Sequence, residues 1–324
     1  MPIDTTEPAY GNDYSNDYCS NPNLPDPVLP PLSRRQADRL VCLALHAAAD
    51  LDLTLTYRGG AALVPTDPAS DKPMVGLSNL ARVVARYEED NWPDLVEEHL
   101  RHILEQLRDG SPPLPADPEG ELIQRIVPRD ALPPDWTTDR PDFVPGLISV
   151  PSMEADGIVT MFLEPSDLDL SWSDAERFGL ANLRRLQDGV EFIDHEDVQI
   201  AFVSGDGYAA SRALVLDTVL RETLQVQDAP YGVLATLPTR DTLILHVIED
   251  LGVIPALGLL LNLAARCYSR DPGPLSPDVF LVTSDFTWHP ATTAPTDHAP
   301  LRLSSELESL VEQLATREIT GPPR

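Results

Sequence analysis

The stretch YGVLATLPTRDTLILHVI, residues 231–248, decides how this chain folds, because it places two apolar segments around a short polar break. Residues 238–241, with the sequence PTRD, are typical of a turn, so the two segments are predicted to pair as antiparallel strands. The second segment, TLILHVI, is apolar on both faces, which favours a position in the centre of a covered sheet. Arg240 is expected to form a local ion pair at the turn, and His246 is expected to be a buried histidine with a hydrogen-bond partner.

Further elements on both sides of this stretch predict the fold class. A strand at 198–203 precedes a helix at 208–224, and a long apolar helix at 252–269 is followed by a strand at 279–283. Sheets built from such segments must bury their apolar faces against the helices. The order of elements therefore predicts an α+β fold with mixed or antiparallel sheets covered by helices, divided into two subdomains.

Composition divides the chain into several segments. Residues 1–32 are polar, with few aliphatic side chains, and are predicted to be a disordered acidic and polar tail. Residues 33–110 predict an N-terminal α+β subdomain, residues 111–120 a linker rich in Pro and Gly, and residues 121–285 the main α+β domain. Residues 286–324 are expected to form a loop and an amphipathic C-terminal helix.

Local patterns predict where individual elements begin. Capping boxes at Ser33, Ser173 and Ser305, each followed three residues later by Gln or Glu, predict three helix starts. Strict alternation in LDLTLTY, residues 51–57, predicts a strand that two glycines connect to AALVP in a hairpin. The segment 284–303 is rich in Pro and Thr and is expected to be a loop.

Residues 188–197, DGVEFIDHED, concentrate carboxylates in what is expected to be a solvated loop. Glu191, Asp194, Glu196 and Asp197 form a candidate surface for a basic partner, because opposite charges favour docking. Carboxylates also suit calcium, but the ligand register and the glycine of an EF-hand loop are missing. The stretch is therefore either a plain acidic loop or a docking surface.

The sequence carries no recognisable catalytic or cofactor motif, since it has no P-loop, no G-x-S-x-G elbow and no H-E-x-x-H. The segment GDG at 205–207 lies between a predicted strand and a predicted helix. It either receives an anion together with Arg212, or it forms a tight turn beside a solvated Arg212. Asp206, Arg212, Arg240 and His246 are the candidate pocket residues, and neither a metal nor a cofactor is expected.

The chain is strongly acidic, with a formal charge of −29 over 324 residues. Nucleic acids and anionic membranes repel such a surface, so neither is an expected partner. No apolar run is long enough to cross a bilayer, and the first residues lack a secretory signal, so a cytoplasmic location is expected. Cys19, Cys42 and Cys267 form neither a disulfide framework nor a zinc pattern.

The order of several short motifs resembles the YtpQ-like bacterial proteins, a family of uncharacterised function. The resembling stretches are VGLSNLARVVARY (75–87), LIQRIVPRDAL (122–132), DLSWSDAERFGLANLRRL (169–186), SGDGYAASRALVLDTVL (204–220), VLATLPTRDTLILHV (233–247) and PLSPDVFLV (274–282). The tyrosine-bearing tail and the extension after residue 285 depart from the family pattern. The resemblance implies a shared fold, and it transfers no catalytic residue to this chain.

These observations favour a non-enzymatic intracellular binding protein, in its specific form an acidic immunity-type inhibitor that neutralises a basic partner. One alternative is a hydrolase-like enzyme whose Asp, Glu and His residues converge only in the fold. Another is a scaffold that recruits partners through its terminal segments. The sequence leaves the oligomeric state open.

Overall fold

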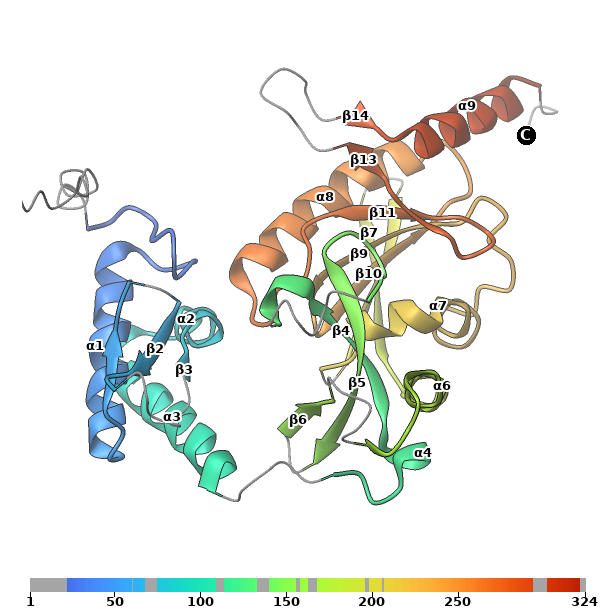
Figure 1. Ribbon diagram of the computed structural model, residues 1–324. Helices are drawn as coiled ribbons and strands as arrows, with labels where there is room; N and C mark the ends of the chain where they lie inside the picture. Colours follow the sequence, from blue (N-terminus) through green and yellow to red (C-terminus); the bar gives the residue numbers. More distant parts are fainter. Residues whose placement is uncertain are drawn as a thin grey trace, which may run out of the picture. The chain divides into compact units, whose positions relative to one another are not determined.

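The protein contains two compact units, Met1–His102 and Ile103–Arg324 (Figure 1). The computed structural model describes residues 22–59, 61–67, 75–108, 114–132, 140–155, 158–162, 168–195, 198–205, 207–293 and 302–320. Across these residues every strand pairing is antiparallel, and helices pack against the sheets. The predicted α+β fold is therefore confirmed. The division between the units falls inside a helix, ahead of the linker expected at 111–120.

The first unit is a small antiparallel sheet with helices before and after it. Its elements are α1 (Arg34–Asp50), β1 (Leu55–Tyr57), β2 (Ala62–Pro65), β3 (Val75–Gly76), α2 (Ser78–Val84), the 3-10 helix η1 (Glu89–Asn91) and most of α3 (Trp92–Arg108). The capping box predicted at Ser33 is present, because Ser33 and Gln36 exchange hydrogen bonds between side chain and backbone. β1 pairs with β2 in the predicted hairpin, but it is shorter than predicted. The chain turns first at Asp52, which has a left-handed φ of 60°.

The segment before α1 belongs to this unit. Leu29 and Leu32 are fully buried, and Asp26 Oδ1 accepts hydrogen bonds from the backbone N–H groups of Val28 and Leu29 at 2.9 and 2.8 Å. The prediction of a disordered tail is therefore wrong for residues 22–32, because the two leucines bury apolar area that offsets the chain entropy. Residues 1–21 lie outside the part of the chain that the structure describes.

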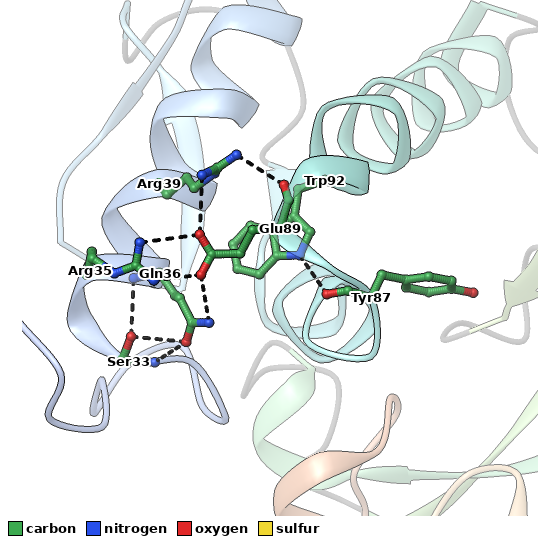
Figure 2. A network of polar contacts seen from close by, with 7 residues as sticks. All are labelled: Ser33, Arg35, Gln36, Arg39, Tyr87, Glu89 and Trp92. Carbon is green, nitrogen blue, oxygen red and sulfur yellow. Dashed lines mark hydrogen bonds and ion pairs between the residues drawn. The ribbon is translucent and has the colours of Figure 1, made fainter.

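A polar network joins α1 to η1 (Figure 2). The Glu89 carboxylate accepts hydrogen bonds from Arg35 Nη2 at 2.7 Å, from Gln36 Nε2 at 3.1 Å and from Arg39 Nη1 at 3.2 Å. The Gln36 amide, followed by the Arg35 guanidinium, holds the pKa of Glu89 below its usual value. The Glu89 carboxylate thus holds the start of α3 against α1. Arg35, Gln36 and Arg39 of α1 are polar because they bind this carboxylate.

Within the described residues the second unit contains three further sheets, and helices pack on the two larger ones. Its elements are α4 (Pro118–Glu121), β4 (Ile123–Pro128), η2 (Arg129–Ala131), β5 (Leu147–Ala155), β6 (Ile158–Met161), α6 (Trp172–Leu183), β7 (Gly189–His195), β8 (Val198–Ser204), η4 (Ala210–Val215), α7 (Leu216–Thr218), η5 (Val219–Thr223), β9 (Val233–Thr239), β10 (Thr242–Val247), α8 (Val253–Arg270), β11 (Val279–Val282), β12 (Trp288–Pro290), β13 (Thr292–Thr293), β14 (Arg302–Leu303) and α9 (Ser305–Thr320). β4, β5 and β6 form the smaller sheet, on which α6 packs.

The large sheet has six strands in the order β12-β11-β9-β10-β8-β7. β10 lies between β9 and β8, so the central position predicted for TLILHVI is confirmed. Thr239 pairs with Thr242, so the turn consists only of Arg240 and Asp241 and is shorter than the predicted PTRD. The predicted strand pair therefore exists with a tighter connection.

Both faces of this sheet are covered. Leu234, Ile244 and Leu281 face a core that includes apolar residues of α8 and α9, and α8 runs along this side of the sheet in Figure 1. Their neighbours in sequence, such as Leu243 and Phe280, face a second core with η4, α7 and η5. Alternate side chains point to opposite faces of a strand, so two covered faces require apolar residues at successive positions.

Two helix starts differ slightly from prediction. α6 is capped by Ser171, whose Oγ accepts a hydrogen bond from Asp174 N at 3.1 Å, and Ser173 lies inside the helix. At α9 the cap is Ser304, whose Oγ accepts from Leu307 N at 3.3 Å, instead of Ser305. Each helix start has two serines within a few positions, namely Ser171 and Ser173 at α6 and Ser304 and Ser305 at α9. The sequence therefore fits more than one position of the N-cap.

Two segments differ in kind from prediction. The helix expected at 208–224 is three short pieces, of which η4 is a 3-10 helix and η5 is a π-helix. The loop expected at 284–303 contains β12, β13 and β14. β12 pairs with β11, and β13 pairs with β14. A strand ending in Pro290 is tolerated there because β12 is an edge strand, where no further ladder bond is needed.

Candidate functional site

Residues 189–195 of the acidic stretch form strand β7, which corrects the prediction of a loop for this part. β7 pairs with β8 along its whole length, from Gly189 opposite Ser204 to His195 opposite Val198. As the last strand of the large sheet, it has no second partner among the described residues. All of its residues are exposed. β7 is therefore a free sheet edge, whose backbone N–H and C=O groups can receive another strand.

The side chains of β7 combine apolar area with negative charge. Val190, Phe192 and Ile193 are 36%, 48% and 37% exposed. Because side chains alternate along a strand, Val190, Phe192 and Asp194 share one face, and Glu191 and Ile193 share the other. Each face of this edge thus presents both an apolar group and a carboxylate.

The sequence located these carboxylates but not the sheet edge that presents them. Of the four acids predicted as a docking surface, Glu191 and Asp194 lie on β7, and Asp194 Oδ1 accepts a hydrogen bond from Gln199 Nε2 at 2.9 Å. Glu196 and Asp197 lie outside the described residues. The stretch lacks the alternation of apolar and polar residues that indicates a strand, because apolar and acidic residues occur on both faces of β7.

Arg212 is neither the anion partner nor the solvated residue that the sequence suggested. Its side chain is 2% exposed, its Nε donates to Asp188 Oδ2 at 2.7 Å, and its Nη1 donates to Leu183 O. Burial raises the pKa of Asp188, and the Arg212 guanidinium opposes part of this rise. The pair ties the end of α6 to the start of β7, so it positions the free edge.

The ion pair predicted at the tip of the β9–β10 hairpin is present, although the turn is shorter than predicted. Arg240 Nε lies 3.4 Å from Asp241 Oδ1, so the local ion pair is confirmed. The Arg240 N–H donates to Gly273 O at 2.8 Å, which anchors the tip.

Gly207, in the segment between β8 and η4, has a φ of 75°, as expected for a tight turn. Asp206 lies outside the described residues.

His246 has the predicted partner but not the predicted burial. Its Nδ1 lies 2.8 Å from Gln199 O, yet the side chain is only partly buried, because it lies near the end of β10. In the described part of the chain, no group of three or more His, Cys, Asp or Glu residues could hold a metal ion. The alternative of a dispersed Asp, Glu and His site remains a prediction.

A second candidate site, which the sequence did not indicate, is a groove beside the connection between β11 and β12. It consists of two hollows of about 260 and 400 Å³ that share Leu216, Asp217 and Phe286. We call it the aromatic groove and define it by Phe143, Arg184, Asp217, Arg221, Phe286 and Trp288. These residues come from separate parts of the chain, so no local motif could have revealed them.

Aromatic rings form one wall of the groove. The Trp288 ring centroid lies 5.0 Å from that of Phe143 and 6.0 Å from that of the buried Phe280. Phe286 is 45% exposed and has a φ of 63°, a left-handed conformation that non-glycine residues rarely adopt. Its N–H donates to Thr283 O at 2.8 Å, so the turn holds this ring at the groove in spite of the strain.

Three charged residues also line the groove. Arg184 Nη1 donates to both carboxylate oxygens of Asp217, at 2.7 and 2.8 Å, and Arg221 Nη2 lies 3.6 Å from Asp217 Oδ2. The side chains of Arg184 and Arg221 are 43% and 54% exposed. Arg221 lies on the π-helix η5, a type of helix that often occurs at functional sites.

The fold and these surfaces define an α+β protein of two compact units with a free acidic sheet edge and an aromatic groove. No family model matches the chain, and neither the curated proteins nor the solved structures gave a match. Across the described residues, no helix is both long enough and apolar enough to pass through a membrane.

Proposed function

We propose that this chain is an intracellular, non-enzymatic binding protein whose edge strand β7 pairs with an extended basic segment of a partner protein. The observation that carries the proposal is the free edge itself, since all residues of β7 are exposed. Strand addition at a sheet edge is a common mode of peptide recognition, in which main-chain hydrogen bonds supply affinity and alternate side chains supply specificity.

The charges of β7 favour a basic partner over a second copy of the same chain. If two copies of β7 paired, Glu191 and Asp194 of one copy would lie near the same acids of the other, and like charges in neighbouring strands are destabilising. Lysine or arginine in the incoming strand would instead form favourable cross-strand pairs. The formal charge of −29 further attracts a basic protein and accelerates its association.

An acidic inhibitor of the immunity type, which neutralises a basic target, is the specific form of this proposal. The order of motifs supports a YtpQ-like family origin, which adds no information on chemistry. The scaffold alternative depends on the terminal segments. Leu307 and Leu314 of α9 are buried in the core of the second unit, so this helix serves the fold first.

Binding of defined peptides tests the proposal. A labelled peptide with alternating lysine and valine is compared with its glutamate–valine counterpart by fluorescence anisotropy. The measurements are made at ionic strengths of about 0.01 M and about 1 M, where the Debye lengths are about 30 Å and about 3 Å. We expect saturable binding of the basic peptide only, with affinity that decreases as salt is added.

Charge reversal on the strand separates edge pairing from general attraction. Glu191→Lys combined with Asp194→Lys should weaken binding of the basic peptide by about tenfold. The matched control is Glu308→Lys with Glu312→Lys, which changes the net charge equally on the exposed face of α9. Equal losses in both double variants, or equal binding of the two peptides, would refute a specific role of β7.

A further inference from the structure

We propose that the aromatic groove binds a small organic anion, namely a carboxylate attached to an aromatic body. This site is separate from the edge proposed for protein binding. The turn with Phe286 connects β11 to β12 at one end of the large sheet, and β7 forms the other end. A failure of one proposal therefore leaves the other intact.

The size of the groove suits such a ligand. Its hollows measure about 260 and 400 Å³, whereas an apolar cavity of about 150 Å³ is enough to hold benzene. Apolar residues of the buried core, among them Leu216 and Leu220, form part of the lining. A ring placed in the groove would contact these side chains and the exposed face of Phe286.

The hydrogen-bond donors of the groove favour a ligand with acceptor oxygens, such as a carboxylate. Both oxygens of Asp217 already accept hydrogen bonds from Arg184, so this carboxylate is satisfied. All hydrogen bonds of the Arg184 guanidinium within the described residues use Nη1, and Arg221 makes only a long contact of 3.6 Å. Arg184 and Arg221 thus share the carboxylate of Asp217, and their remaining N–H donors can bind the carboxylate of a ligand. Asp228 also lines the groove and is exposed, as Arg184 and Arg221 are, so the two carboxylates balance the two guanidinium charges. The preference for a carboxylate rests on the guanidinium donors that remain unused.

The aromatic part of the groove is held at a fixed position, which reduces the entropy lost on binding. Trp288 is fixed by its ring contacts, and the turn from Thr283 to Thr287 holds Phe286. Within this turn Thr283 N donates to Thr287 O at 3.0 Å, and Asp285 Oδ1 accepts from Thr287 N at 3.3 Å. A planar guanidinium such as that of Arg221 matches the geometry of a carboxylate.

Titration calorimetry with 2-naphthoate and its neutral amide, 2-naphthamide, tests the proposal on the unmodified full chain. We expect naphthoate to bind at one site and naphthamide to bind about tenfold more weakly, since a charge-assisted hydrogen bond is lost. Both ligands are tested on the unmodified chain, so a folding defect of a variant cannot affect the comparison. Absence of saturable naphthoate binding, or equal affinity for acid and amide, overturns the proposal.

Three variants locate the site. Arg221→Gln should weaken naphthoate binding by about tenfold and leave naphthamide binding unchanged. Phe286→Gly removes the ring, suits the left-handed backbone and should weaken both ligands. Arg317→Gln is the matched control, because Arg317 also lies beside an aromatic ring, that of Tyr231, but on α9. Wild-type affinity in the first two variants, with circular dichroism showing a folded chain, would place the ligand elsewhere and refute the assignment.

Discussion

Replacement of Arg212 by methionine should strongly destabilise the second unit. The change keeps most of the side-chain length and removes the guanidinium that pairs with Asp188 at 2.7 Å. Both side chains are almost fully buried, with exposures of 2% and 3%. The variant therefore leaves a carboxylate without its cation in a site from which water is excluded. Leu183 O loses its hydrogen-bond donor as well.

Loss of one partner of a buried ion pair costs about 3–5 kcal/mol. For a unit of this length, each kcal/mol lowers the melting temperature by about 2–4 °C, so a decrease of roughly 6–20 °C is expected. Arg184→Met is the matched control, because Arg184 pairs with Asp217 at the surface, with side chains 43% and 33% exposed. An exposed pair contributes at most about 1 kcal/mol.

The pH dependence gives a second signature. Burial already raises the pKa of Asp188, and the variant loses the guanidinium that lowers it, so the pKa rises further. An acid whose folded pKa exceeds its unfolded pKa stabilises the fold below the unfolded value. That stability is lost as the pH rises through the folded pKa. The free energy of unfolding that Arg212→Met loses should therefore be smaller at about pH 4 than at about pH 7.

Thermal unfolding followed by circular dichroism measures these effects, and a second replacement provides the decisive comparison. Arg212→Met combined with Asp188→Leu removes both charges and should recover much of the lost stability. The assignment of a buried pair is refuted if Arg212→Met is no less stable than Arg184→Met. It is also refuted if the double variant is no more stable than the single one.

Two further predictions concern the packing of Gly232 and the burial of Cys267. Gly232→Ala should cost more than about 4 kcal/mol in urea unfolding, because its Cβ would lie 2.0 Å from a backbone oxygen of β11. Gly146→Ala, at a similar positive φ but with open space, should cost only about 1–2 kcal/mol, and equal losses would contradict the packing of Gly232. Burial raises the pKa of Cys267 to about 11, so its alkylation rate should still increase well above pH 9. In a Cys19→Ser background the exposed Cys42 should react first at neutral pH, and faster labelling of Cys267 would disprove its burial.

The elements that could be predicted are those whose signal is local. The two apolar segments within 231–248 predicted the β9–β10 pair and its central position, because successive apolar residues need cover on both faces. The capping box at Ser33 marked the start of α1, because both of its hydrogen bonds lie within one helical turn. Such features depend on residues that are neighbours in the sequence.

The candidate sites could not be predicted, because they depend on contacts between distant residues. Arg212 looked like a solvated helix residue, and only the fold brings it to Asp188, which lies 24 positions earlier. The acids of β7 were recognised as a charged stretch, but a free sheet edge is a property of the strand order. Phe286 gave no signal either, because its left-handed backbone is imposed by the surrounding turn.

The ring of Trp288 connects the solvent-facing groove with the interior of the second unit. It contacts Phe143 on one side and Phe280, a buried residue of β11, on the other. Any molecule that binds to this ring in the folded state only therefore stabilises the folded second unit. A ligand at a hundred times its dissociation constant would add about 2.7 kcal/mol, so the melting temperature of this unit would itself report occupancy.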